Sequence, residues 1–178
     1  MKRLPGAAKF GQHGFSLIEL MIAMVVLAVG LLGGIAVICA ATASNGRSRL
    51  NTTAATLAES TMEKIEALPA DATGGAAVTS VSDCKGTSFI VDSNPGGSPL
   101  ASSGTHVDFT QPALDGYSMQ YVACSTGQII YDVRWRIDPG PTPSTQLVII
   151  SAKPLVGPAA TGTGFARPIT LRSLRGVL

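Results

Sequence analysis

Residues 14–41 read GFSLIELMIAMVVLAVGLLGGIAVICAA, and no charged residue follows Glu19 in this stretch. The uncharged run continues to Gly46. At about 1.5 Å per residue, a helix over Leu20–Ala41 spans about 33 Å, which is enough to cross a hydrocarbon core of ~30 Å. The alternative is a secretory signal peptide, whose apolar region is shorter (about 7–15 residues) and ends at a small-residue cleavage site. We therefore predict a membrane anchor.

The composition fits such an anchor joined to one small domain. The chain has 178 residues, of which 46% are hydrophobic, 5% aromatic and 13% charged. Its mean hydropathy of +0.33 is high for a protein that lies wholly in water. The net charge of +2 excludes a strongly basic nucleic-acid binder as the first interpretation.

Glu19 is the one acidic residue of the apolar segment. A charge inside a membrane segment costs ~2.5–3.5 kcal/mol on insertion scales and usually marks function. The alternative is a carboxylate that stays wet at the headgroup boundary. Residues 1–14 before it contain three basic residues and no acid, so the positive-inside rule predicts a cytoplasmic N-terminus.

The run Gly14-Phe15-Ser16-Leu17-Ile18-Glu19 resembles the class III leader of type IV pilins and pseudopilins. The resemblance implies removal of residues 1–14 by the prepilin peptidase between Gly14 and Phe15, and N-methylation of Phe15 by the same enzyme. It also implies that Glu19 pairs with the N-terminal amine of a neighbouring subunit. A buried carboxylate and a buried ammonium stabilise each other, and removing one strands the other. The 14-residue leader is somewhat long for type IVa pilins.

Two further segments, Met24–Gly33 with its Ala-Val-Gly-Leu-Leu-Gly ending and Thr56–Glu59, resemble PilV-type minor pilins. This resemblance implies an inner-membrane protein that joins a type IV pilus, at the tip or in an initiation complex. The implied partners are other major and minor pilins and the inner-membrane assembly platform. Two alternatives stay open: a minor pseudopilin of a type II secretion system, and a membrane-anchored periplasmic ligand-binding domain.

A second apolar pattern continues the helix beyond the anchor. Apolar or small residues recur at helical spacing; they are Leu50, Ala54, Leu57, Thr61, Ile65 and Leu68. We predict one helix over residues 15–68, because Pro69 disfavours helical geometry in the residue before it. The expected parts are a membrane half (15–42), a periplasmic half (43–69) and a periplasmic β-rich head (70–178).

Glycines interrupt this helix at four positions, each weakening it by ~1 kcal/mol relative to Ala; they are Gly30, Gly33, Gly34 and Gly46. Gly30 and Gly34 form a G-x-x-x-G pattern, which permits close helix contact but often arises by chance. From the resemblance we expect bending or local melting near these glycines when a subunit enters a filament.

The head shows strand patterns. We predict strands at residues 88–92, 117–123, 128–137 and 146–152, a hairpin turn at Ser125–Gly127 and a loop at Pro139–Pro143. Residues 129–137 alternate, with apolar side chains at odd positions, so one face of this strand should lie on a core. The fold class is α+β: a type IV pilin-like long helix with a small antiparallel sheet packed on its C-terminal half.

The chain has three cysteines. Cys39 lies in the apolar segment, where a thiol behaves as a small hydrophobe. Cys84 and Cys124 lie in the part expected to be periplasmic and oxidising, where a bridge would stabilise by about 4 kcal/mol in the entropy model. A metal site is the competing interpretation, but it lacks third and fourth ligands.

Nothing indicates catalysis. Outside the leader the only histidine is His106, which we interpret with Asp108 as a wet loop pair. Phosphate-loop, nucleophile-elbow and zinc-protease motifs are absent from the sequence, so we expect no enzyme, cofactor or metal. Three basic residues with little aromatic interleaving are weak grounds for a nucleic-acid interface, and we expect no DNA binding; they are Arg167, Arg172 and Arg175.

Charge is distributed unevenly along the chain. Glu59, Glu63 and Glu66 form an acidic stripe on the helix, either a solvated face or a contact for a basic partner. Residues 50–138 carry four basic and ten acidic groups, whereas residues 139–178 carry four basic groups and no acid. Such asymmetry suits head-to-tail packing of subunits without requiring it.

Overall fold

The computed structural model describes residues 16–70, 78–124, 129–155 and 168–176. One helix, α1, runs from Leu17 to Glu66. It ends two residues before the predicted Leu68, whose N–H bonds the Ile65 carbonyl in a tightened last turn (3.3 Å). The chain forms two compact units, Met1–Asn45 and Gly46–Leu178, and α1 contributes residues to both.

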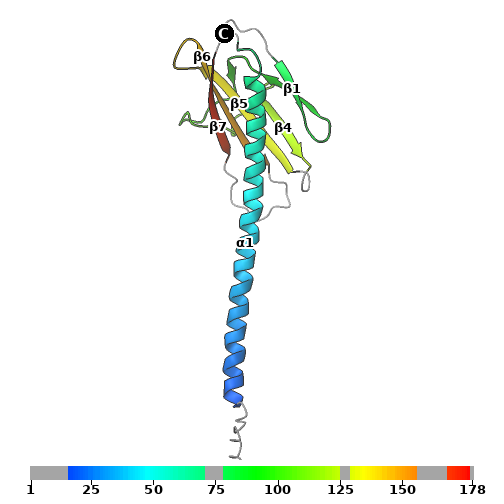
Figure 1. The fold of residues 1–178 in the computed structure, drawn as a ribbon, viewed down its shortest axis with the longest axis vertical. Helices are drawn as coiled ribbons and strands as arrows, with labels where there is room; N and C mark the ends of the chain where they lie inside the picture. The colour runs from blue at the N-terminus through cyan, green and yellow to red at the C-terminus, as the bar shows by residue number, and fades with distance from the viewer. Residues whose placement is uncertain (1–15, 71–77, 125–128, 156–167, 177–178) are drawn as a thin grey trace, which may run out of the picture. The chain divides into compact units, whose positions relative to one another are not determined.

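All strand pairs in the second unit are antiparallel. The strands are β1 (Val78–Ser82), β2 (Ser88–Asp92), β3 (Gly96–Gly97), β4 (Ser118–Ala123), β5 (Ile129–Pro139), β6 (Thr145–Leu155) and β7 (Ile169–Gly176). The β1–β2 hairpin is a separate two-stranded sheet. In the larger sheet β5 is flanked by β6 on one side and by β3 and β4 on the other, and β7 follows β6 (Figure 1).

The predicted strands are confirmed, with β5 and β6 longer than expected, whereas β1, β3 and β7 were not predicted. The predicted turn Ser125–Gly127 lies outside the described residues. β3 depends on Gly97, where φ is +116° and an added Cβ would meet the Trp135 carbonyl oxygen at 2.5 Å. Only glycine permits this approach of two backbones.

The core lies between the sheet and the C-terminal part of α1. Helix residues Ala54, Leu57 and Ile65 are buried against the odd-numbered side chains of β5, among them the fully buried Trp135. The Trp135 indole N–H donates to the Asp92 carbonyl (2.9 Å), which satisfies its polar atom inside the core. The α+β class, with a long apolar N-terminal helix and a small antiparallel sheet, is therefore confirmed.

The middle of the opposite face of β5 is also buried, although its residues are charged. Asp132 and Arg134 are only 6% and 7% exposed. Segment 108–111 contacts Arg134 from outside the sheet strands. The Arg134 Nη2 donates to the Asp132 carboxylate (2.8 Å) and its Nη1 donates to the Gln111 carbonyl (2.7 Å). The guanidinium also lies 5.1 Å from the centroid of the Phe109 ring. A charge pair buried in this way needs every available partner.

Candidate functional site

Glu19 lies in the first turn of α1, where a negative charge interacts favourably with the helix dipole. The Glu19 backbone N–H donates to the Ser16 carbonyl (3.0 Å), so the helix is already formed at this residue. Within the described residues, the Glu19 carboxylate has no hydrogen bond and no salt bridge. Gly14 and Phe15, predicted to flank the cleavage site, lie outside the described residues.

The side chains around Glu19 are apolar and exposed. Leu17 is 76% exposed and Leu20 55%, and the large apolar side chains onward to Ile38 are all more than half exposed. Within the part of the chain that the structure describes, α1 is the one helix long and apolar enough to cross a membrane. The apolar part of α1 is exposed throughout in the single chain. A carboxylate thus sits at one end of an uncovered apolar helix.

The four helix glycines leave open space around the backbone, since a Cβ at Gly30, Gly33, Gly34 or Gly46 would meet no atom within 4 Å. α1 is continuous through all of them. The bending or melting expected in a filament therefore stays a prediction for the assembled state.

The same N-terminal segment has a counterpart among known families. Residues 9–35 match the prokaryotic N-terminal methylation motif. The matched segment includes Gly14, Phe15 and Glu19, and it reaches into the apolar part of α1. Comparisons with curated proteins and with solved structures give no match.

The motif supports a place in the type IV pilin and pseudopilin superfamily, and the long helix with its small sheet agrees with that fold. It implies processing by a prepilin peptidase and association with pilin assembly machinery. Together with the apolar helix it supports anchoring in a membrane. Motif and fold both indicate a structural protein rather than an enzyme.

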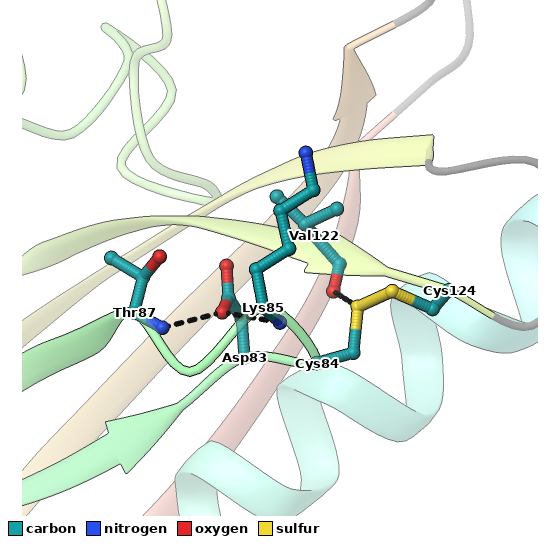
Figure 2. The surroundings of a disulfide bond; sticks show 6 residues. All are labelled: Asp83, Cys84, Lys85, Thr87, Val122 and Cys124. Carbon is teal, nitrogen blue, oxygen red and sulfur yellow. Dashed lines mark hydrogen bonds between the residues drawn. A yellow bond between two sulfur atoms is a disulfide. The ribbon is translucent and has the colours of Figure 1, made fainter.

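Cys84 and Cys124 form a disulfide, with their Cα atoms 6.0 Å apart (Figure 2). The bond joins the β1–β2 turn to the residue after β4. Asp83 organises this turn, because its Oδ1 accepts hydrogen bonds from the backbone N–H groups of Lys85 (2.9 Å) and Thr87 (2.8 Å). The Cys84 Sγ lies 2.9 Å from the Val122 carbonyl oxygen; a disulfide sulfur has no hydrogen to donate, so this is a contact only. The disulfide excludes the metal alternative for these two cysteines.

Arg175 was considered above as part of a basic surface, but it is buried in the head. Its guanidinium donates to Gln146 Oε1 (2.8 Å), to the Ile65 carbonyl at the end of α1 (2.9 Å) and to the Ser93 carbonyl (2.6 Å). Burial lowers the pKa of Arg175, and the nearby Glu66 carboxylate opposes that shift. Arg175 therefore joins the helix end to the sheet and is not available to nucleic acid.

The other basic residues of that group differ. Arg172 is exposed and donates to the Gly104 carbonyl (2.9 Å), whereas Arg167 lies outside the described residues. Sequence reasoning missed the buried role of Arg175 because a charged residue breaks the apolar alternation of β7. One signal was present: two of the other three residues on its side of β7, Ile169 and Leu171, are apolar.

The remaining candidates are surface features. The His106 Nδ1 lies 3.1 Å from the Thr105 hydroxyl, and the Asp108 carboxylate accepts a hydrogen bond from the Thr110 hydroxyl (2.7 Å). Across the described ranges, no group of three or more His, Cys, Asp or Glu residues could hold a metal ion. The acidic stripe, Glu59, Glu63 and Glu66, is exposed.

Proposed function

We propose that this chain is a minor type IV pilin of the PilV type. It is cleaved between Gly14 and Phe15, methylated at Phe15 and held in the inner membrane by a single span. Its N-terminus faces the cytoplasm and its head the periplasm. It then enters a pilus through an initiation or tip complex with other minor pilins.

One observation carries the proposal: a methylation motif whose single carboxylate, Glu19, has no partner among the described residues and is surrounded by exposed apolar side chains. A charge in hydrocarbon is costly without a counter-charge. The ammonium that peptidase cleavage creates at Phe15 of a neighbouring subunit supplies that charge. The span and the pairing are thus two consequences of the same short segment.

The first test is the mature N-terminus. Mass spectrometry of the chain recovered from the envelope should show a first residue Phe15 that carries a methyl group. A Gly14→Leu variant should keep residues 1–14 and run unshifted on a gel. A wild-type chain that retains its leader would instead support a membrane-anchored ligand-binding domain.

The second test compares two acidic residues of α1. Glu19→Ala should insert normally but be strongly depleted from sheared filaments, because the neighbouring amine loses its counter-charge. Glu63→Ala is the matched control, since Glu63 is an exposed acid on the head half of the same helix. Wild-type levels of the Glu19→Ala chain in sheared filaments would remove the pairing role.

The motif is shared by pseudopilins, so the system needs a separate test. A deletion strain should lose surface pili and twitching while keeping secretion of type II substrates. Loss of secretion with normal pili would assign the chain to the minor pseudopilins of a type II secretion system.

A further inference from the structure

Two strand edges of the head, one on β1 and one on β7, have no partner strand among the described residues. Among the described residues β1 pairs only with β2, and β7 pairs only with β6. β2 lies beside β4, since the Asp92 N–H bonds the Gly116 carbonyl (2.9 Å). The β1 and β7 edges therefore lie at opposite sides of the head, with β4, β5 and β6 between them (Figure 1). An open edge presents backbone N–H and C=O groups to another strand.

The hydrogen bonds show which residues direct their backbone groups outward on β1. The Asp83 N–H bonds the Thr87 carbonyl, so odd-numbered residues of β1 face β2. In an antiparallel ladder the direction alternates along the strand. Val78, Ser80 and Ser82 therefore turn their N–H and C=O groups to the open edge.

The same reasoning applies to β7. The Trp135 N–H bonds the Tyr117 carbonyl, so odd residues of β5 face β4 and even residues face β6. Carried through the registers of β6 and β7, the alternation makes even-numbered residues of β7 face outward. Thr170, Arg172 and Leu174 are thus the counterparts of the three outward residues of β1.

Strand direction also fits. Cys84, just before β2, is bonded to Cys124, just after β4, while Asp92 at the end of β2 meets Gly116 before β4. β2 is therefore antiparallel to β4, and β1 runs parallel to β4. β7 runs parallel to β5 and so opposite to β1. Two heads that stand in the same orientation would bring β1 and β7 together as antiparallel strands.

One register brings together the exposed apolar side chains of both edges. Pairing Ser80 with Arg172 places Val78 opposite Leu174, which are 55% and 56% exposed in the single chain. It also makes hydrogen-bonded pairs of all outward residues. β1 contains no charged residue and no proline, so it has neither of these usual protections against strand addition, and Arg172 meets no like charge.

We propose that the β7 edge of one head binds the β1 edge of a second copy of this chain, as an antiparallel strand pair. Because the two edges differ, the contact is head-to-tail and joins copies in open series. The contact rests on the proposed function for its setting, a membrane in which anchored copies share one orientation. All residues that form the proposed contact belong to β1 and β7.

Cross-linking of full-length chains tests the contact. In a Cys39→Ala background, one tagged copy carries Val78→Cys and a differently tagged copy carries Leu174→Cys, and a short bis-maleimide is added to cells. The expected product is a mixed dimer that carries both tags. Neither of the two same-tag dimers should form. Gln120→Cys, exposed on β4 away from both edges, replaces Val78→Cys in the matched control and should give no product. Ser82→Cys with Thr170→Cys reports the same register if the first pair fails to accumulate.

A second experiment tests the backbone hydrogen bonds of the proposed contact. Ser80→Pro removes an N–H that the β1–β2 hairpin does not use, so the head should fold while the mixed dimer is lost. Ser80→Ala keeps that N–H and should cross-link like the parent. Dimers of Leu174→Cys with itself would overturn the head-to-tail contact, as would cross-linking unaffected by Ser80→Pro. A chain with methylated Phe15 that gives no mixed dimer overturns this contact and leaves the proposed function standing, whereas an unprocessed chain overturns the proposed function.

Discussion

The two halves of α1 have the same secondary structure and opposite surroundings. Leu17–Asn45 exposes its large apolar side chains all round, whereas the half that begins at Gly46 buries one stripe, Ala54 to Ile65, against the sheet. Charges follow the same division. Glu19 in the first half has no partner among the described residues. Arg175 of β7, which donates to the Ile65 carbonyl near the end of the second half, has three acceptors.

The difference separates what the chain stabilises by itself from what it leaves for other molecules. The second half and the sheet close their own core, so helix formation there follows from tertiary packing. The first half gains nothing from its own chain and needs lipid or other helices to cover it. Changes in the head should therefore alter folding, and changes near Glu19 should alter assembly.

The largest expected effect on folding comes from the disulfide. Replacing Cys84 and Cys124 by serine should destabilise the head by about 4 kcal/mol, because a loop of this length is no longer closed in the unfolded chain. Urea unfolding of the detergent-solubilised chain, followed by fluorescence of the single Trp, measures the change. Membrane insertion of the variant should be normal. A variant that fails to insert would show that the two halves do not act separately.

The second prediction compares matched truncations in the two halves. Ile65→Ala should destabilise the head by about 3 kcal/mol, because Ile65 is fully buried and its loss leaves a cavity. Leu27→Ala removes a similar side chain that is 63% exposed in the first half, and it should leave the urea midpoint unchanged. A shift of the midpoint by Leu27→Ala would contradict the division of α1 described above.

The sequence predicted this division because both patterns are local. An uncharged run shows a membrane-length helix, and recurrence at three- and four-residue spacing shows the buried stripe. Strand β2 was predicted with its observed bounds, 88–92, because its apolar residues stand out. β1 was missed because Val78–Ser82 lies in a Gly/Ser/Thr-rich region and becomes a strand by pairing with β2. The burial of Arg134 was missed because its contacts with segment 108–111 join residues that are distant in the sequence.

The third prediction concerns the charge that the head satisfies internally. Arg175→Leu should destabilise the head by about 2 kcal/mol, since the Ile65 carbonyl, the Ser93 carbonyl and the Gln146 side chain each lose a hydrogen bond from the guanidinium. Arg172→Leu, an exposed change on the same strand, is the control and should stay within about 0.5 kcal/mol. Equal effects of the two substitutions in urea unfolding would show that the buried guanidinium does not join helix and sheet.

The smallest expected effect on the stability of the head comes from Asp108. A matching change at Glu19 then tests whether charges in the two regions are independent. Hydrogen bonds from the Thr110 hydroxyl and N–H lower the pKa of Asp108. A carboxyl group with a lowered folded pKa adds stability above its unfolded pKa and loses it as the pH falls through the folded value. Asp108→Asn should therefore be slightly less stable than the parent at neutral pH, and the difference should close below about pH 3.9. Glu19→Gln should leave the acid unfolding of the head unchanged, because the Glu19 carboxylate has no salt bridge among the described residues. A shifted acid transition in Glu19→Gln would mean that Glu19 has a partner in the head of the same chain, and its pairing with a neighbouring subunit would lose its physical basis.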